Sequence, residues 1–85
     1  MNNIDEIKKK IIYRSGYRGI KEMDILLGSF VKKYINDFNI IELKQLDYLL
    51  NLDDDNLLRW YQNRKCSIKI PKNSVSNLLK KFKIK

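Results

Sequence analysis

Apolar residues recur at the three- and four-residue spacing of an amphipathic helix in five stretches of this chain. The stretches are 3–15, 19–36, one opened by Asn39, one that follows Asp53–Asp55, and one that begins near Pro71. A helix with one apolar stripe is stable only when other helices cover that stripe. Because short polar segments separate the stretches, the pattern predicts an all-α fold, a compact five-helix bundle.

The predicted core takes one face from each helix. Its members are Ile4, Ile7, Ile11 and Ile12; Met23, Leu26, Leu27, Phe30, Val31 and Tyr34; Leu43, Leu46, Leu49 and Leu50; Leu57, Leu58, Trp60 and Tyr61; and Val75, Leu78, Leu79 and Phe82. Gly28 interrupts the second stripe at a cost of ~1 kcal/mol relative to Ala, so we expect another helix to approach closely there. We expect Pro71 in the first turn of the last helix and a loop or extended piece over 64–70.

The length of 85 residues predicts one domain over 1–85, in which 71–85 form a basic C-terminal helix and tail. No apolar run approaches the ~20 residues of a membrane span, so we expect no membrane insertion. The first residues, Met1–Glu6, lack an apolar signal core and include early acidic residues. They favour a cytoplasmic location, and we expect a monomer.

The chain has no histidine and one cysteine, Cys66. The usual zinc sites, internal disulfides and histidine-dependent catalysis are therefore excluded. Carboxylates remain, but no pairing suited to acid–base chemistry is evident. The run Asp53–Asp55 suits a helix start better than a calcium loop, whose ligands spread over about twelve residues around a glycine. We expect no enzymatic activity, no metal and no cofactor bound by the chain itself.

The net charge of +8 is unevenly placed. Residues 37–55 hold six acidic residues and only Lys44, whereas 56–85 hold nine basic residues and no acid. This C-terminal third could contact phosphates or an acidic protein, or it could be a solvated, lysine-biased tail. We favour the tail, because few aromatic residues interleave with the lysines. A small basic helical nucleic-acid-binding protein is the alternative function.

The junction Arg18–Glu22 joins the first two predicted helices. Fourteen of the eighteen basic residues are lysine, so an arginine at Arg18 indicates a need for the forked guanidinium. In one reading Arg18 and Glu22 form an i,i+4 surface pair worth ~0.2–0.5 kcal/mol. In the other they form a protein-docking surface with Gly19 as a point of close approach, and Tyr13 and Tyr17 add aromatic contact area.

Two blocks of sequence resemble a known family. The stretch 12–30 reads IYRSGYRGIKEMDILLGSF, and the stretch 49–60 reads LLNLDDDNLLRW. The first is similar to the Arg-Gly-x-x-Glu signature of the succinate dehydrogenase flavinylation factors, and the second to the acidic turn, Leu and Trp of that family. The resemblance covers roughly residues 4–63, and the C-terminal third carries no recognisable signature. Gly16 and Tyr17 depart from the bulkier or basic residues that often precede the arginine.

The resemblance implies a five-helix assembly factor without its own catalytic group. Such a factor binds the flavoprotein subunit of succinate dehydrogenase, or of fumarate reductase in some bacteria, and promotes covalent attachment of FAD to that partner. By match to the motif, Arg18, Gly19 and Glu22 would line the contact with the partner. Tyr13, Arg14 and Asp24 would be their neighbours, and Trp60 would belong to the core.

Overall fold

The computed structural model describes residues 3–16 and 18–83, without the side chain of Asn3, and over these residues the fold is all-α as predicted. The helices are α1 (Asn3–Ser15), α2 (Lys21–Tyr34), α3 (Ile40–Leu50), α4 (Asp54–Tyr61) and α5 (Ser74–Lys81). The radius of gyration is 12.2 Å. A compact chain of this length is expected to have about 12 Å, so the helices form one packed body.

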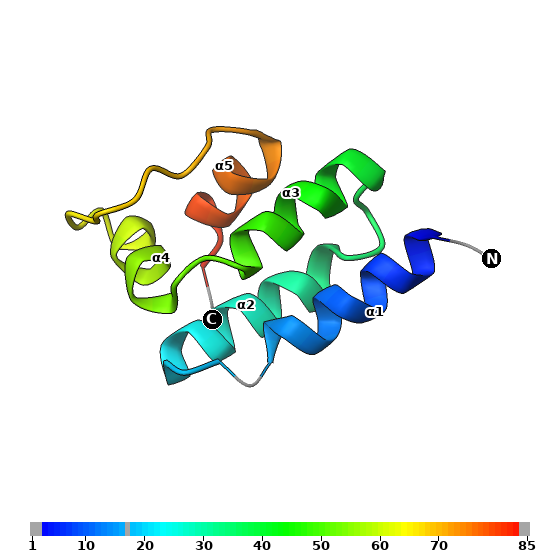
Figure 1. The fold of residues 1–85 in the computed structure, drawn as a ribbon, viewed down its shortest axis with the longest axis horizontal. Helices are drawn as coiled ribbons and strands as arrows, with labels where there is room; N and C mark the ends of the chain where they lie inside the picture. Colours follow the sequence, from blue (N-terminus) through cyan, green and yellow to red (C-terminus); the bar gives the residue numbers. More distant parts are fainter. Residues whose placement is uncertain (1–2, 17, 84–85) are drawn as a thin grey trace.

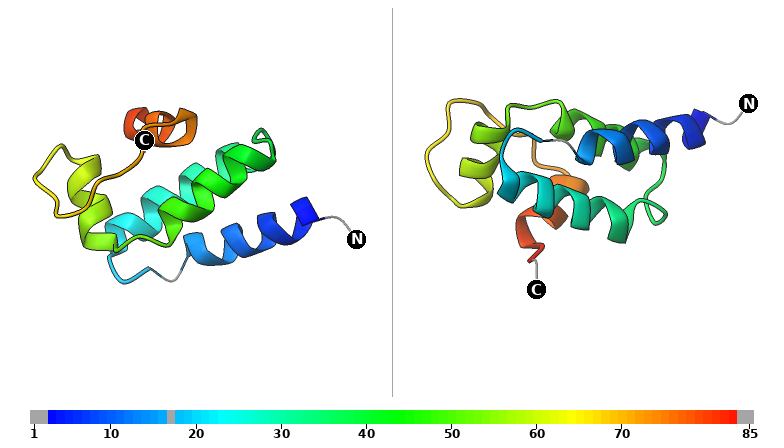
Figure 2. Two further views of the ribbon diagram at one scale, coloured as in Figure 1. Left: turned by 45° about the horizontal axis from the view of Figure 1, so that its top comes forward. Right: turned by 90° about the horizontal axis from the view of Figure 1, so that it is seen from below.

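The three longest helices form the centre of the molecule (Figure 1). Helix α1 packs against both α2 and α3, and α5 packs against α3 on the side away from α1 (Figure 2). The link between α4 and α5 arches around the outer edge without regular structure, as expected for 64–70. The start of α2 and the start of α4 lie at one end of the molecule, and the start of α1 lies at the other. Two segments far apart in sequence therefore meet at the α2–α4 end.

Most of the predicted core residues are buried. The fully or nearly buried apolar residues are Ile11, Met23, Leu26, Leu27, Phe30, Val31, Ile35, Leu43, Leu46, Leu49, Leu50, Leu57, Ile70, Val75 and Leu79. Trp60 packs partly buried against this core, which confirms its structural assignment. Ile12 is an exception, with 54% of its surface exposed. Neighbouring side chains on a helix point about 100° apart, so the burial of Ile11 turns Ile12 outward.

Capping boxes set the start of two helices. The Asn39 side chain accepts the Glu42 backbone N–H at 2.8 Å, and Glu42 accepts the Asn39 N–H at 3.0 Å, which completes a capping box on α3. Asn73 and Ser76 form the same arrangement on α5. Because Asn73 is the cap, α5 begins at Ser74, and the prediction that Pro71 lies in its first turn is wrong.

Gly28 differs from its sequence-based expectation. A Cβ added at this glycine would meet no other atom within 4 Å, so no second helix approaches it among the described residues. Gly28 instead opens onto a surface groove between α1 and α2, which is also lined by Ile12, Val31 and Ile35. The residue lies at the edge of the buried stripe of α2, where the helix turns from core to solvent.

Part of the basic charge in the C-terminal third packs against aromatic rings. The Lys80 ammonium lies 4.5 Å from the centroid of the Trp60 ring and also donates to the Trp60 carbonyl. Lys83 lies 5.5 Å from the centroid of the Tyr61 ring. Burial lowers the pKa of the Lys80 ammonium, and the charge of the nearby Cys66 partly offsets this shift. These lysines join α5 to α4, so this part of the chain is more than a solvated tail.

Candidate functional site

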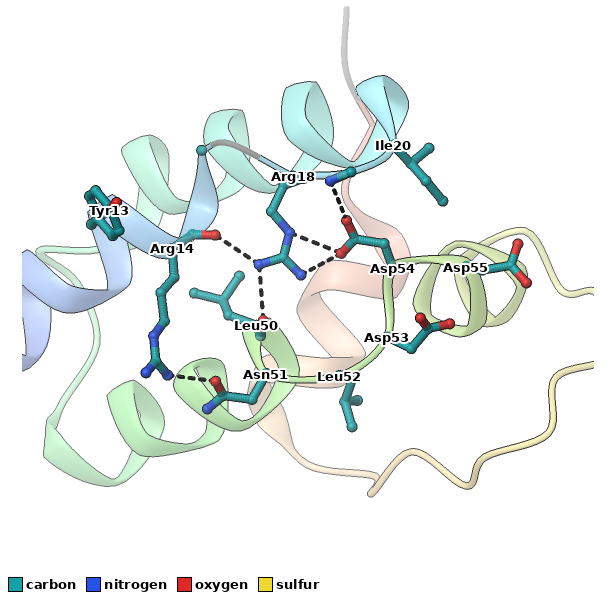
Figure 3. Close-up of a pocket in the computed structure, with 12 residues that line it drawn as sticks. Tyr13, Arg14, Arg18, Ile20, Leu50, Asn51, Leu52, Asp53, Asp54 and Asp55 are labelled. Carbon is teal, nitrogen blue, oxygen red and sulfur yellow. Dashed lines mark hydrogen bonds and ion pairs between the residues drawn. The ribbon is translucent and has the colours of Figure 1, made fainter.

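The link between α1 and α2 and the link between α3 and α4 together line a broad, open hollow of about 790 Å³ (Figure 3). The first segment contributes four of the six predicted site residues. The lining residues are Tyr13, Arg14, Gly16, Arg18, Gly19 and Ile20 from the first segment, and Leu50, Asn51, Leu52, Asp53, Asp54 and Asp55 from the second. The site is therefore built from two parts of the chain, of which the motif is one.

Arg18 is the residue that joins these two parts. Its Nε and Nη2 donate to Oδ1 of Asp54 at 2.9 and 2.5 Å. Its Nη1 donates to the backbone carbonyls of Arg14 and Leu50, at 2.8 and 2.9 Å. These two carbonyls belong to the last turns of α1 and α3, where helix carbonyls lack partners of their own. A cation beside these helix ends is also favoured by their dipoles.

This arrangement explains the arginine and corrects the expected position of its side chain. The Arg18 side chain is only 9% exposed, and the Asp54 side chain is 16% exposed. The planar guanidinium can reach a carboxylate and two carbonyls at once, which the ammonium of lysine cannot do in the same geometry. Arg18 does not pair with Glu22, so the i,i+4 surface pair is absent. The fork serves the interior of the chain and is not presented to solvent.

Gly19 is held by the same carboxylate. Its backbone N–H donates to Oδ2 of Asp54 at 3.0 Å, so Asp54 accepts from both the arginine and the glycine of the motif. A Cβ at Gly19 would meet only Asp54 Oδ2, at an ordinary 3.9 Å. The N–H of Gly19 is thus turned toward α4, and the next residue, Ile20, is extended. Helix α2 therefore starts at Lys21, two residues later than the predicted start at Gly19.

Arg14 and Tyr13 lie at the rim of the hollow. Arg14 donates to the Asn51 side chain at 2.5 Å and to Asp47 at 3.3 Å, and its side chain is 35% exposed. The ring of Tyr13 is 71% exposed, which makes it the most exposed large apolar side chain of the described residues. An exposed aromatic ring beside a half-buried arginine has the composition that protein interfaces favour.

Glu22 and Asp24 lie on the first turn of α2, outside the lining of the hollow. Glu22 is exposed, and within the described residues its side chain has no hydrogen bond or ion pair. Asp24 is partly buried, and its carboxylate lies beside Gly16 on the α1–α2 link. The structure thus brings together Tyr13, Arg14, Arg18 and Gly19, and places Glu22 nearby on a free surface. Tyr17 lies outside the described residues.

The acidic run 53–55 has three different roles. Asp53 caps α4 by accepting the Asn56 N–H at 3.1 Å, as the helix-start prediction requires. Asp55 forms an i,i+4 pair with Arg59 on the surface. Asp54, in contrast, faces the motif, and sequence reasoning missed this role. The sequence did contain a sign of this contact. An arginine retained among lysines indicates a planar acceptor, and the stretch 49–60 supplies three carboxylates.

The hollow presents groups that are suited to recognition. Over the described residues, no group of three or more His, Cys, Asp or Glu side chains is arranged to hold a metal ion. Among the helices that are described, none combines the length and apolar character needed to cross a membrane. On its α1–α2 side the hollow offers a fixed backbone turn, an exposed ring and one half-buried cation. Such a surface is suited to contact with another macromolecule.

Comparison with known proteins decides the family. The sequence model of the family described as "Flavinator of succinate dehydrogenase" matches residues 9–83. The chain belongs to this family. The match extends through the C-terminal third, in which sequence inspection found no signature. Family membership does not favour the nucleic-acid alternative.

Curated relatives agree with this assignment. The chain is similar to "Succinate dehydrogenase assembly factor 2, mitochondrial" of Saccharomyces cerevisiae, at 39% identity over 80 residues, which are 93% of this chain and 49% of the relative. The Scheffersomyces stipitis protein of the same name is 46% identical over 56 residues, or 65% of this chain and 38% of the relative. The chain therefore spans about half or less of the length of these relatives. No solved structure matches it.

The expected cytoplasmic location is wrong. The relatives from both yeasts are named as mitochondrial proteins, as is the 2-A form of Drosophila mojavensis, which is 37% identical over 75 residues. The expectation rested on the residues that begin this sequence. Because half or more of each relative lies outside the matched region, those residues are no guide to targeting.

Proposed function

We propose that this chain assists the assembly of succinate dehydrogenase in the mitochondrion. It binds the flavoprotein subunit of that enzyme and promotes covalent attachment of FAD to it. The observation that carries the proposal is the family match over residues 9–83, within which the Arg-Gly-x-x-Glu motif is complete at Arg18, Gly19 and Glu22. The names of the relatives support the same enzyme and the same organelle.

The docking surface in this proposal is the α1–α2 side of the rim, at Tyr13 and Gly19, together with the first turn of α2. Tyr13 supplies an exposed ring, and Glu22 supplies an exposed carboxylate that pairs with none of the described residues. The Cα of Gly19 lets a partner's backbone come close between them. Arg18 belongs to the frame of this surface, because its Nε, Nη1 and Nη2 already donate to acceptors within the chain.

In this proposal the chain contributes no reacting group. The flavin and the residue that receives it both belong to the complex of FAD with the partner subunit. Holding two reacting groups in a productive arrangement can lower a barrier by roughly 7–11 kcal/mol in the best intramolecular cases. A rigid helical domain that binds one conformation of the partner favours that arrangement by population shift.

The test is a flavinylation assay with purified apo-flavoprotein subunit of succinate dehydrogenase and FAD, with and without this chain. Flavin fluorescence is read from denaturing gels at successive times. We expect covalent flavin on the large subunit to appear faster when the chain is present, and none on the 10.2 kDa band. Equal rates in the two reactions, or fluorescence on the small band, would overturn the proposal.

A further inference from the structure

Asp54 has contacts that its position at a helix start does not require. Helix α4 is already capped by Asp53, whose side chain accepts the Asn56 N–H. Asp54, one residue later, directs both carboxylate oxygens away from its own helix and toward the motif (Figure 3). Oδ1 accepts from Arg18, and Oδ2 accepts from the N–H of Gly19. One side chain thus binds the two consecutive residues that open the motif.

The geometry points to Asp54 as a positioning residue for docking, which acts by fixing the Arg18–Gly19 backbone in the shape that the partner recognises. This inference rests on the proposed function. Between α1 and α2, residues 16 and 18–20 have no regular structure, so without a tie their backbone would sample many conformations. Docking would then have to order that backbone, and the cost would weaken the complex.

The charge of Asp54 is part of this role. The Arg18 guanidinium is 9% exposed and its Nη1 is bonded to two neutral carbonyls, so Asp54 is the carboxylate that neutralises it. Without that carboxylate the cation would be largely buried and unpaired, and it would tend to move out toward water. Such a movement would release its hold on the last turns of α1 and α3 and displace Gly19 with it.

Asp55 provides a matched control. It is the next residue, lines the same hollow and carries the same charge at the same helix start. Its side chain is 60% exposed and pairs only with Arg59 on its own helix. Asp54→Asn and Asp55→Asn therefore change the net charge and the α4 dipole in nearly the same way. Only the first removes the carboxylate from the motif.

The experiment measures two quantities for wild type and both variants. Amide hydrogen exchange of Gly19, read by nitrogen-15 NMR on the free chain, reports whether the backbone is held. The dissociation constant for the purified flavoprotein subunit reports docking, and it is measured well below the melting temperature of each variant so that all are folded. We expect Asp54→Asn to raise Gly19 exchange at least tenfold and to weaken docking at least tenfold, with Asp55→Asn close to wild type in both.

Each other outcome has a definite meaning. Unchanged docking by a folded Asp54→Asn overturns the inference, and so does weaker docking with unchanged Gly19 exchange, because Asp54 would then contact the partner directly.

If Asp54→Asn does not fold, Arg18→Leu combined with Asp54→Leu removes both charges and leaves none buried. We expect that variant to fold with Gly19 unprotected and docking impaired, and wild-type docking by it overturns the inference. Failure of wild type to bind the subunit overturns the proposed function, while Gly19 exchange still decides whether Asp54 fixes the loop.

Discussion

Arg18 and Asp54 lie 36 residues apart in the sequence and form a largely buried ion pair through two N–H donors to one carboxylate oxygen. The pair ties the α1–α2 link to the start of α4. The pair changes what the arginine of the motif is expected to do, because an arginine that supports the fold must show its effect in stability as well as in binding.

Arg18→Lys is expected to destabilise the chain by roughly 1–3 kcal/mol, since lysine cannot replace the bidentate contact and the two carbonyl bonds together. For a domain of this size each kcal/mol corresponds to about 4–8 °C of melting temperature. Thermal unfolding followed by circular dichroism measures the change. Arg59→Lys is the matched control, because the Arg59–Asp55 pair is exposed and i,i+4. It should change stability by less than about 0.5 kcal/mol. A surface role for Arg18 would make the two melts alike.

Glu22→Gln should weaken binding and leave stability nearly unchanged, unlike Arg18→Lys. The Glu22 carboxylate is exposed and makes no hydrogen bond or ion pair with the described residues, so stability should change by less than about 0.5 kcal/mol. We expect affinity for the flavoprotein subunit to fall, as measured by titration calorimetry. Glu6→Gln, an exposed acid in the first turn of α1, serves as the control and should bind like wild type. Equal affinity of the two variants would remove Glu22 from the docking surface.

Gly19→Arg is expected to fold and to lose docking. A Cβ at Gly19 meets only one carboxylate oxygen at 3.9 Å, and the backbone there is not left-handed, so the chain itself tolerates a side chain. A long side chain would, however, occupy the place where a partner's backbone approaches. Size-exclusion chromatography with the flavoprotein subunit gives the result. Complex formation by the folded variant would show that no partner packs at this position.

Gly28→Ala should stabilise the chain by about 0.5–1 kcal/mol, the usual difference between these residues inside a helix. The reason is specific to this position, because the new methyl group meets no atom within 4 Å. Chemical denaturation with urea measures the gain. A loss of stability would mean that α2 packs more closely at Gly28 than the structure describes.

The regular part of the fold could be predicted from the sequence because its causes are local. Apolar spacing identified all five helices of the described chain, and Asn39 with Glu42 marked the start of α3. Predictions failed where contacts with other segments decide where a helix starts or which side chain is buried. Helix α2 starts at Lys21 because Ile20, which follows the Gly19 held by Asp54, is extended, and Ile12 faces outward because Ile11 occupies the buried position.

The site could be predicted only in part, because it too depends on contacts between distant segments. The motif identified Arg18 and Gly19, but no local pattern links either of them to a carboxylate 35 or 36 residues later. The acidic run was explained by helix capping, which is correct for Asp53 and left no reason to look further. An arginine in a lysine-rich chain predicts a carboxylate partner, but the sequence alone does not say which carboxylate that partner is.

The tie between Arg18 and the Leu50 carbonyl has a practical consequence for inhibitor design. The residues of the family signature are continuous in the sequence, yet their shape depends on atoms contributed by the end of α3 and the start of α4. A synthetic peptide that copies 12–24 would carry every letter of the signature and the Arg14 carbonyl, but neither the Leu50 carbonyl nor the Asp54 carboxylate. Such a peptide should compete poorly with the intact domain, and a useful mimic must graft both segments onto one scaffold.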